Sequence, residues 1–233
     1  MFAPDGPSLL ELVIEGLSST RVGYDRLAPR FDVTPFRTPD ALLEVVAAHL
    51  ASGPRIGRVV DLCCGTGAAL EHLAPHADAL VGVDFSPGML AVAKRRLAAH
   101  RDRLTLIEAD VLAWEPDRQA DLVTLFGAWG HVPGREPELL ALVHRLLRPG
   151  GRFVFVTAPH PGPAQRAFWL GHAFNAAMRV RNALIPPPFV MLYLKFPLAR
   201  ALELCRAAGL EPSVHPLGWD ERPDDVLVDA VRS

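Results

Sequence analysis

The stretch from Val59 to Gly67 reads Val-Val-Asp-Leu-Cys-Cys-Gly-Thr-Gly and is followed by Ala-Ala-Leu-Glu-His-Leu at positions 68–73. The apolar run begins at Ile56, and such a run predicts a strand that is buried on both faces of a sheet. Residues 68–73 predict a helix. Because Gly65 and Gly67 carry no Cβ, the backbone between strand and helix can approach a ligand closely. Ligands of open α/β sheets bind at such carboxyl ends of strands.

Further apolar segments downstream predict more strands of the same sheet, and two of them end in an acid. These segments are Leu80–Asp84, Leu104–Asp110 and Asp121–Phe126. Parallel strands present their carboxyl ends at one edge of the sheet, so the residues that follow them are expected to meet there. An acid at the place of Asp84 can accept hydrogen bonds from both hydroxyls of a ribose.

The motifs at residues 59–67, 82–90, 108–111 and 146–151, in this order, resemble those of the class I S-adenosylmethionine-dependent methyltransferases. The Cys-Cys-Gly-Thr-Gly variant is similar to that of the quinone-ring C-methyltransferases of the ubiquinone and menaquinone type. The Asn-rich run of that group is absent after the Tyr-Asp pair. The resemblance implies an α/β fold: a Rossmann-like, seven-stranded, mostly parallel sheet with an antiparallel last strand and helices on both faces. It also implies S-adenosyl-L-methionine as the cofactor.

The glycine turn departs from the family at one position, where Cys63 stands in place of a glycine. Cysteine is small, so we expect the turn to survive with a slightly tighter pocket. A dinucleotide site would need a further glycine at the position of Leu70, because a pyrophosphate requires a close helix approach. The turn therefore favours a nucleoside with a sulfonium tail, and a dinucleotide site or a plain structural turn are the alternatives.

The resemblance assigns the parts of the cofactor to residues that follow the strands. It implies that Asp84 holds the ribose, Asp110 the adenine, and Asp61 the amino group of the methionine end. The Asp110 side chain can alternatively cap the segment that follows it, and Met89 can be a core residue. The expected cofactor-binding residues are Tyr24, Asp61, Cys63, Cys64, Gly65, Thr66, Gly67, Asp84, Phe85, Met89, Asp110, Val111, Phe126 and Gly127.

Two residues are candidates for a catalytic role. The run from Tyr24 to Asp32 resembles the lid of small-molecule methyltransferases, in which the tyrosine closes over the methionine end and the acceptor. A buried tyrosine that packs on the sheet is the alternative. His131 follows the fourth strand and is the residue there that can act as a general base near neutral pH. A structural histidine is the alternative reading of His131.

We expect a single methyltransferase domain over residues 1–233. An N-terminal helical lid (1–50), including a short helix over 8–17, precedes the cofactor-binding core (51–158). An insertion (159–196) covers the acceptor, and a C-terminal helix with the last two strands (197–233) completes the sheet. The insertion is rich in large apolar side chains, which favours an apolar acceptor or a homodimer contact.

Composition limits the other functions. The net charge of −2 gives no basic field for nucleic acid. The three cysteines form no disulfide framework, and the nine histidines show no ligand spacing, so no metal is expected. No signal peptide or membrane-spanning run is evident, which predicts a cytoplasmic protein without stable membrane insertion.

The sequence thus predicts an enzyme that transfers a methyl group from S-adenosylmethionine to a small acceptor, apolar or aromatic in character. Positioning dominates such chemistry, because the sulfonium itself supplies the reactivity. Two alternatives remain open at this point. One is a non-catalytic S-adenosylmethionine-binding protein, and the other is a different S-adenosylmethionine-using reaction on the same fold.

Overall fold

The computed structural model describes residues 6, 8, 11, 17–34, 36–159, 161–191, 196–218 and 223–233. The short helix expected over 8–17 lies mostly outside the described residues. Within the described part of the chain, no helix combines the length and apolar character needed to cross a bilayer.

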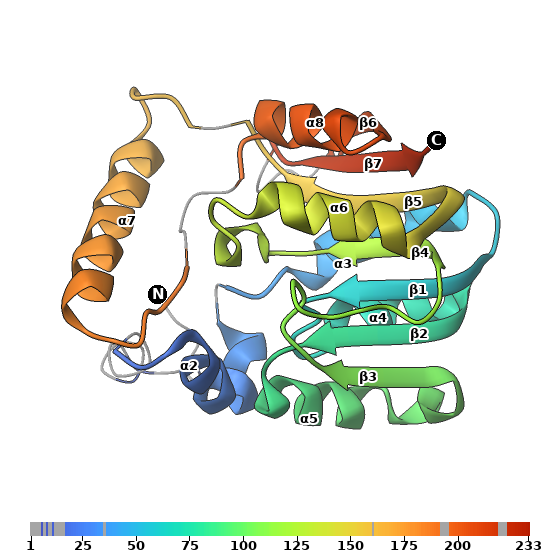
Figure 1. Cartoon of the computed structure of the whole chain (residues 1–233), viewed down its shortest axis with the longest axis horizontal. Coiled ribbons are helices and arrows are strands. Elements are labelled where there is room, and N and C mark those ends of the chain that lie inside the picture. The colour runs from blue at the N-terminus through green and yellow to red at the C-terminus, as the bar shows by residue number, and fades with distance from the viewer. Residues whose placement is uncertain are drawn as a thin grey trace.

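One seven-stranded sheet forms the centre of the molecule, in the order β3-β2-β1-β4-β5-β7-β6 (Figure 1). The first five strands run parallel, whereas β7 is antiparallel to both β5 and β6. This topology confirms the predicted fold class. The strands are β1 (Ile56–Leu62), β2 (Ala77–Asp84), β3 (Leu104–Glu108), β4 (Ala120–Leu125), β5 (Leu147–Thr157), β6 (Leu210–Pro216) and β7 (Val226–Arg232).

Adjacent residues of a strand point to opposite faces of the sheet, and both faces carry apolar side chains that helices cover. Val59 packs in a core with α3 (Asp40–Ala51), α4 (Ala68–Leu73) and α5 (Pro87–Arg96). Its neighbour Val60 belongs to a second core, and that core is closed by α6 (Glu136–Leu146) and α8 (Leu198–Ala207).

The N-terminal part of the lid is docked on the start of α5. Helix α2 (Thr20–Leu27) continues into a 3₁₀ turn at Ala28–Val33. The Asp25 carboxylate accepts hydrogen bonds from the Ser86 hydroxyl (2.6 Å) and the Gly88 N–H (3.0 Å). Ser86 also caps α5, with its hydroxyl accepting from the Met89 N–H at 3.1 Å. These bonds hold α2 at the carboxyl edge of the sheet, at the left in Figure 1.

The insertion forms helix α7 (Arg166–Leu184), which stands beyond the strand ends and away from the sheet (Figure 1). Trp169 and Leu170 on this helix are 63% and 66% exposed. Residues 185–191 follow α7 directly and lead back toward the sheet, where the Val190 carbonyl oxygen contacts His131.

Two element boundaries are set by backbone contacts. Helix α5 ends at Arg96, and a 3₁₀ turn follows at Ala98–Arg103. The Arg103 guanidinium donates to the backbone carbonyls of Ala74 and Ala77, which draws this turn toward the start of β2. Strand β5 already begins at Leu147, where it pairs with Ala120 before the register shifts.

Gly82, in the middle of β2, provides a test of this packing. A Cβ there would lie 2.8 Å from Cys64 Sγ and 2.9 Å from a methyl carbon of Leu106. Gly82→Ala is therefore expected to lower the free energy of unfolding by ~1–3 kcal/mol in chemical denaturation. Gly162→Ala is the matched control, because nothing lies within 4 Å of its Cβ position. Equal effects of the two substitutions would contradict the packing.

Candidate functional site

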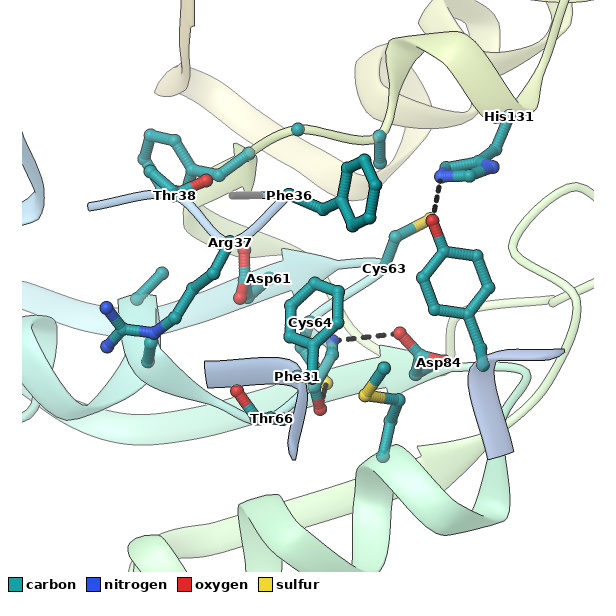
Figure 2. A pocket seen from close by; sticks show the side chains of 18 of the residues that line it. Phe31, Phe36, Arg37, Thr38, Asp61, Cys63, Cys64, Thr66, Asp84 and His131 are labelled. Carbon is teal, nitrogen blue, oxygen red and sulfur yellow. Dashed lines mark hydrogen bonds between the residues drawn. The ribbon is translucent and has the colours of Figure 1, made fainter. Parts of the chain in front are cut away.

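A cleft opens at the carboxyl ends of β1, β2 and β4, beneath the lid (Figure 2). It encloses about 760 Å³, including the part that is open to solvent. The residues that line it come from the lid, the glycine turn and the loops after β2 and β4. They are Tyr24, Phe31, Phe36, Arg37, Thr38, Leu43, Asp61, Cys63, Cys64, Gly65, Thr66, Ala68, Ala69, Asp84, Phe85, Met89, Phe126, Gly127, Ala128 and His131.

Asp84 ties the glycine turn to the start of α5. One carboxylate oxygen accepts from the Gly65 N–H at 2.8 Å and the other from the Ser86 N–H at 2.9 Å. Burial raises the pKa of Asp84, while these backbone bonds oppose the rise. An ionised carboxylate has about four acceptor positions, so two bonds leave capacity on both oxygens. Nothing lies within 4 Å of the Cβ position of Gly65, and the backbone is therefore open to a ligand there.

Asp61 is the second buried acid of the cleft, at 2% exposure. The Thr124 hydroxyl on β4 donates to its Oδ1 at 2.7 Å. Burial raises the pKa of Asp61 to about 7, and the nearby charge of Asp84 adds to the rise. A cationic ligand group beside Asp61 would favour its ionised form.

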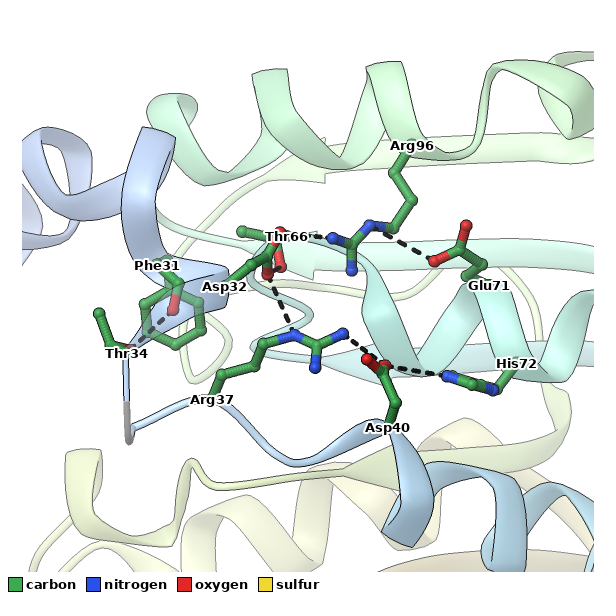
Figure 3. Close-up of polar contacts among 9 residues, drawn as sticks. All are labelled: Phe31, Asp32, Thr34, Arg37, Asp40, Thr66, Glu71, His72 and Arg96. Atoms are coloured by element: carbon green, nitrogen blue, oxygen red, sulfur yellow. Dashed lines mark hydrogen bonds and ion pairs between the residues drawn. The ribbon is translucent and has the colours of Figure 1, made fainter. Parts of the chain in front are cut away.

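Arg37 closes the far end of the cleft from His131 (Figure 2). Its guanidinium pairs with Asp32 at 3.2 Å and with Asp40, and Asp32 also accepts from the Thr66 hydroxyl at 2.7 Å (Figure 3). Arg96 on α5 completes the cluster by its ion pair with Asp32. One network of ion pairs and hydrogen bonds thus joins the glycine turn, the lid and α5.

Tyr24 and His131 face each other at the other end. The Tyr24 hydroxyl lies 3.0 Å from His131 Nε2, and His131 Nδ1 lies 2.8 Å from the Val190 carbonyl oxygen. The carbonyl is only an acceptor, so Nδ1 carries the proton and Nε2 accepts from the Tyr24 hydroxyl. Burial lowers the pKa of His131, although the Val190 carbonyl opposes this. Burial also raises the pKa of Tyr24, and both groups are neutral near pH 7 as a result.

The cleft brings together most of the residues expected from the sequence, whereas Gly67, Asp110 and Val111 do not line it. Gly67 caps α4 with a φ of 79°. Asp110 accepts from the Leu112 N–H at 2.9 Å, as in the capping alternative. Sequence reasoning singled out no residue between the 3₁₀ turn at Ala28–Val33 and α3, a segment that contributes Phe36, Arg37 and Thr38. The signal available in the sequence was Arg37, a basic residue in a segment that precedes the first predicted strand.

A cluster outside the cleft was also missed. In the part of the chain that the structure describes, His49, His215 and Asp229 form one group with ligand atoms within 4.8 Å of one another. The Arg152 guanidinium already donates to Asp229, and its Nη2 lies 3.3 Å from His49 Nε2. Although burial opposes ionisation, Arg152 holds the pKa of Asp229 below its usual value. The positive charge beside Asp229 and His49 is therefore supplied by Arg152.

The family model described as a methyltransferase domain matches residues 59–151. A demethylmenaquinone methyltransferase of Renibacterium salmoninarum is 33% identical over 188 residues, which cover 73% of this chain and 72% of that relative. The chain belongs to the class I S-adenosylmethionine-dependent methyltransferases. Its cofactor is accordingly S-adenosylmethionine, as the motifs predicted.

Other relatives extend the comparison of this methyltransferase. The demethylmenaquinone methyltransferase of Thermus thermophilus is 34% identical over 145 residues, or 59% of this chain and 65% of that relative. The chain spans about half of two further relatives of that name, 47% and 49%. The solved structure of the DhpI–SAH complex matches with a TM-score of 0.66 at 24% identity, over 96% of this chain and 98% of that one. It supports the fold.

Cys63 is the residue of the glycine turn whose backbone is strained. Its φ of 55° lies in the left-handed region, which costs a non-glycine residue roughly 1–2 kcal/mol. We expect Cys63→Gly to leave the free energy of unfolding unchanged or raise it by up to ~1 kcal/mol, since relief of strain offsets the added chain entropy. The measurement is chemical denaturation.

The adjacent cysteine supplies the control for that substitution. Cys64 is 7% exposed, belongs to the core beneath the turn, and is not among the residues with positive φ. Cys64→Gly should therefore cost at least ~2 kcal/mol, because it removes packing and relieves no strain. Similar losses at both positions would rule out strain at Cys63.

Proposed function

We propose that this enzyme transfers a methyl group from S-adenosylmethionine to a small, uncharged aromatic or apolar acceptor that loses a proton. The observation that carries the proposal is the neutral Tyr24–His131 pair, joined at 3.0 Å, in the same cleft as two buried acids. The acids suit the cofactor, and the pair suits an acceptor that must be deprotonated.

The polar groups of the cleft fit the cofactor. Asp84 keeps acceptor capacity for the two ribose hydroxyls, and the open space over Gly65 leaves room for the nucleoside. Asp61 suits the ammonium group of the methionine end. Arg37, also in the lining, suits its carboxylate. When bound, S-adenosylmethionine supplies a methyl group on a positively charged sulfur, which leaves as a neutral thioether when the acceptor's electron pair bonds the methyl carbon.

The proton of the acceptor leaves through the Tyr24–His131 pair. An acceptor hydroxyl donates to the Tyr24 oxygen, and the Tyr24 proton passes to His131 Nε2 at the same time. Tyr24 thus stays neutral, in keeping with its raised pKa, and His131 becomes the imidazolium. His131 can hold this charge because its Nδ1–H already points at the Val190 carbonyl. Release to solvent then restores the neutral pair.

The acceptor class follows from the groups around this pair. Phe31 and Phe85 lie beside Tyr24, with ring centroids 6.1 and 6.3 Å from it, and the Phe189 ring stacks on it at 6.2 Å. Apart from His131, Arg37 is the only basic side chain in the lining that the structure describes. It is committed to the other end of the cleft. A ring-hydroxylated, uncharged acceptor such as a naphthohydroquinone suits this end, and the similarity to demethylmenaquinone methyltransferases agrees with that chemistry.

The protonation of Asp61 gives cofactor binding a defined pH dependence. Its carboxyl has a pKa of about 7 in the free protein, and the cofactor's ammonium group binds the ionised form. Affinity for S-adenosylmethionine should therefore rise about five-fold from roughly pH 6 to roughly pH 7. Calorimetric titration measures it. Asp61→Asn should bind more weakly and show no such rise, and an equal rise in that variant would exclude Asp61 as the source.

The proton path is tested by substituting its two members. Tyr24→Phe and His131→Gln should each lower kcat by ~100-fold, and the double variant should be no slower, because the two residues act as one unit. The assay follows methylated product from 1,4-naphthohydroquinone under anaerobic conditions, with small carboxylic acids as contrasting acceptors. Cofactor affinity should change little.

His76→Gln is the matched control for that assay. His76 ends the 3₁₀ turn that precedes β2, at the opposite edge of the sheet from the cleft, and it does not line the cleft. Its kcat should equal that of the wild type. Additive losses in the Tyr24–His131 double variant, or faster methylation of the carboxylic acids, would count against the proposal.

A further inference from the structure

The segment that follows α7 reaches the Tyr24–His131 end of the cleft. The Val190 carbonyl oxygen accepts the His131 Nδ1 proton at 2.8 Å. The Phe189 ring stacks on Tyr24, with 15° between the ring planes. Two consecutive residues of the insertion therefore contact both members of the proton path, one through the backbone and one through a side chain.

This segment is held mainly by the amide of one side chain. Asn182, in the last turn of α7, donates from Nδ2 to the Phe189 carbonyl at 3.1 Å and accepts the Phe189 N–H on Oδ1 at 2.9 Å. An amide can satisfy both backbone groups of one residue only in a single orientation, so the pair of bonds fixes Phe189 in place. The Val190 N–H adds a bond to the Thr20 hydroxyl at 2.7 Å.

The end of α7 is in turn anchored to the lid. Arg181 donates to the Pro187 carbonyl at 2.7 Å and to the Ser18 carbonyl at 2.8 Å. Since Ser18 and Thr20 stand at the start of α2, the helix that carries Tyr24 and the segment that carries Val190 are joined on two sides. The Asn182 amide lies outside the cleft lining and so touches neither the cofactor nor the reacting atoms.

From these contacts we infer that Asn182 is a positioning residue for methyl transfer. It holds the Val190 carbonyl against His131 Nδ1, so that Nε2 alone is free to receive the proton from Tyr24. This inference rests on the proposed function for its catalytic meaning. The insertion would then control the proton acceptor of the reaction, besides covering the acceptor molecule.

The electrostatic surroundings of His131 define what loss of Asn182 would change. The titratable group in contact with it is Tyr24 on α2, and Cys63 after β1 and Asp84 at the end of β2 act electrostatically on Tyr24. Burial raises the pKa of Tyr24 and of Cys63, so both are neutral near pH 7. Burial is also the main cause of the lowered pKa of His131. Release of the segment exposes His131 to water, and its pKa then rises toward the ordinary value of about 6.5.

The test is the tautomer and the titration of His131, read by two-bond ¹H–¹⁵N correlation on the full chain with ¹⁵N-labelled histidine. His131→Gln assigns the signal. In the wild type we expect the Nδ1–H tautomer alone and a His131 titration midpoint below the ordinary pKa of histidine. In Asn182→Ala we expect mixed tautomers and a His131 titration midpoint at higher pH. Arg179→Ala, an exposed substitution on the same helix, should leave both unchanged.

A second variant covers the case in which Asn182→Ala does not fold. Thr20→Val keeps the side-chain shape and removes the hydroxyl that accepts the Val190 N–H and donates to the Pro188 carbonyl. It should shift the His131 tautomer and titration midpoint in the same direction. A wild-type tautomer and transition in the folded variants would overturn the inference.

Activity separates the inference from the proposed function. In the naphthohydroquinone assay, Asn182→Ala should lower kcat by at least ~10-fold, move its acid limb to higher pH and leave cofactor affinity unchanged. If the wild type transfers no methyl group while the His131 tautomer still depends on Asn182, the proposed function fails and the positioning of His131 stands. An active variant with the wild-type pH profile overturns the inference alone.

Discussion

The site depends on the buried carboxylate of Asp84 and on the two backbone N–H groups that donate hydrogen bonds to it. Gly65 belongs to the turn after β1 and Ser86 to the start of α5, so one side chain joins the carboxyl ends of two neighbouring strands. A buried carboxylate is costly unless it is hydrogen-bonded, and these bonds compensate part of that cost. The same bonds hold the group in one orientation, which suits the proposed role of Asp84 toward the ribose hydroxyls.

The lid is built on this junction. Ser86, whose N–H binds Asp84, uses its hydroxyl both to cap α5 and to donate to Asp25. Asp25 follows Tyr24 on α2, so a few covalent and hydrogen bonds link the position of the tyrosine to that of the Asp84 carboxylate. The other side of the lid is held by Asp32, which receives the Thr66 hydroxyl of the glycine turn and the guanidinium of Arg96. The glycine turn and residues 20–33 are therefore one connected structure.

Helix α7 of the insertion is anchored at its C-terminal end. Much of α7 is exposed, yet its last turn is tied by Arg181 and Asn182 to the lid and to the segment over His131. An isolated helix is only marginally stable in water, so these terminal contacts matter for its placement. They also place the Val190 carbonyl oxygen against Nδ1 of His131, which lies on a different loop, so that this nitrogen carries the proton. The proposed chemistry thus draws on three segments that are remote in sequence.

The apolar runs and the glycine turn predicted strands and a ligand edge from the residues alone, because hydrophobic periodicity and turn chemistry are local properties. The seven-stranded sheet, the family and the cofactor followed from the resemblance of the motifs to a known family. That resemblance also singled out Asp61, Asp84 and Thr66, which the structure brings together in the cleft. The sequence could not predict the placement of Arg37, the hydrogen bond between Tyr24 and His131, or the contact of the Val190 carbonyl. No local pattern indicates which distant segments fold over a strand end. Only the tertiary structure decided which nitrogen of His131 carries the proton, because that depends on a backbone carbonyl 59 positions away.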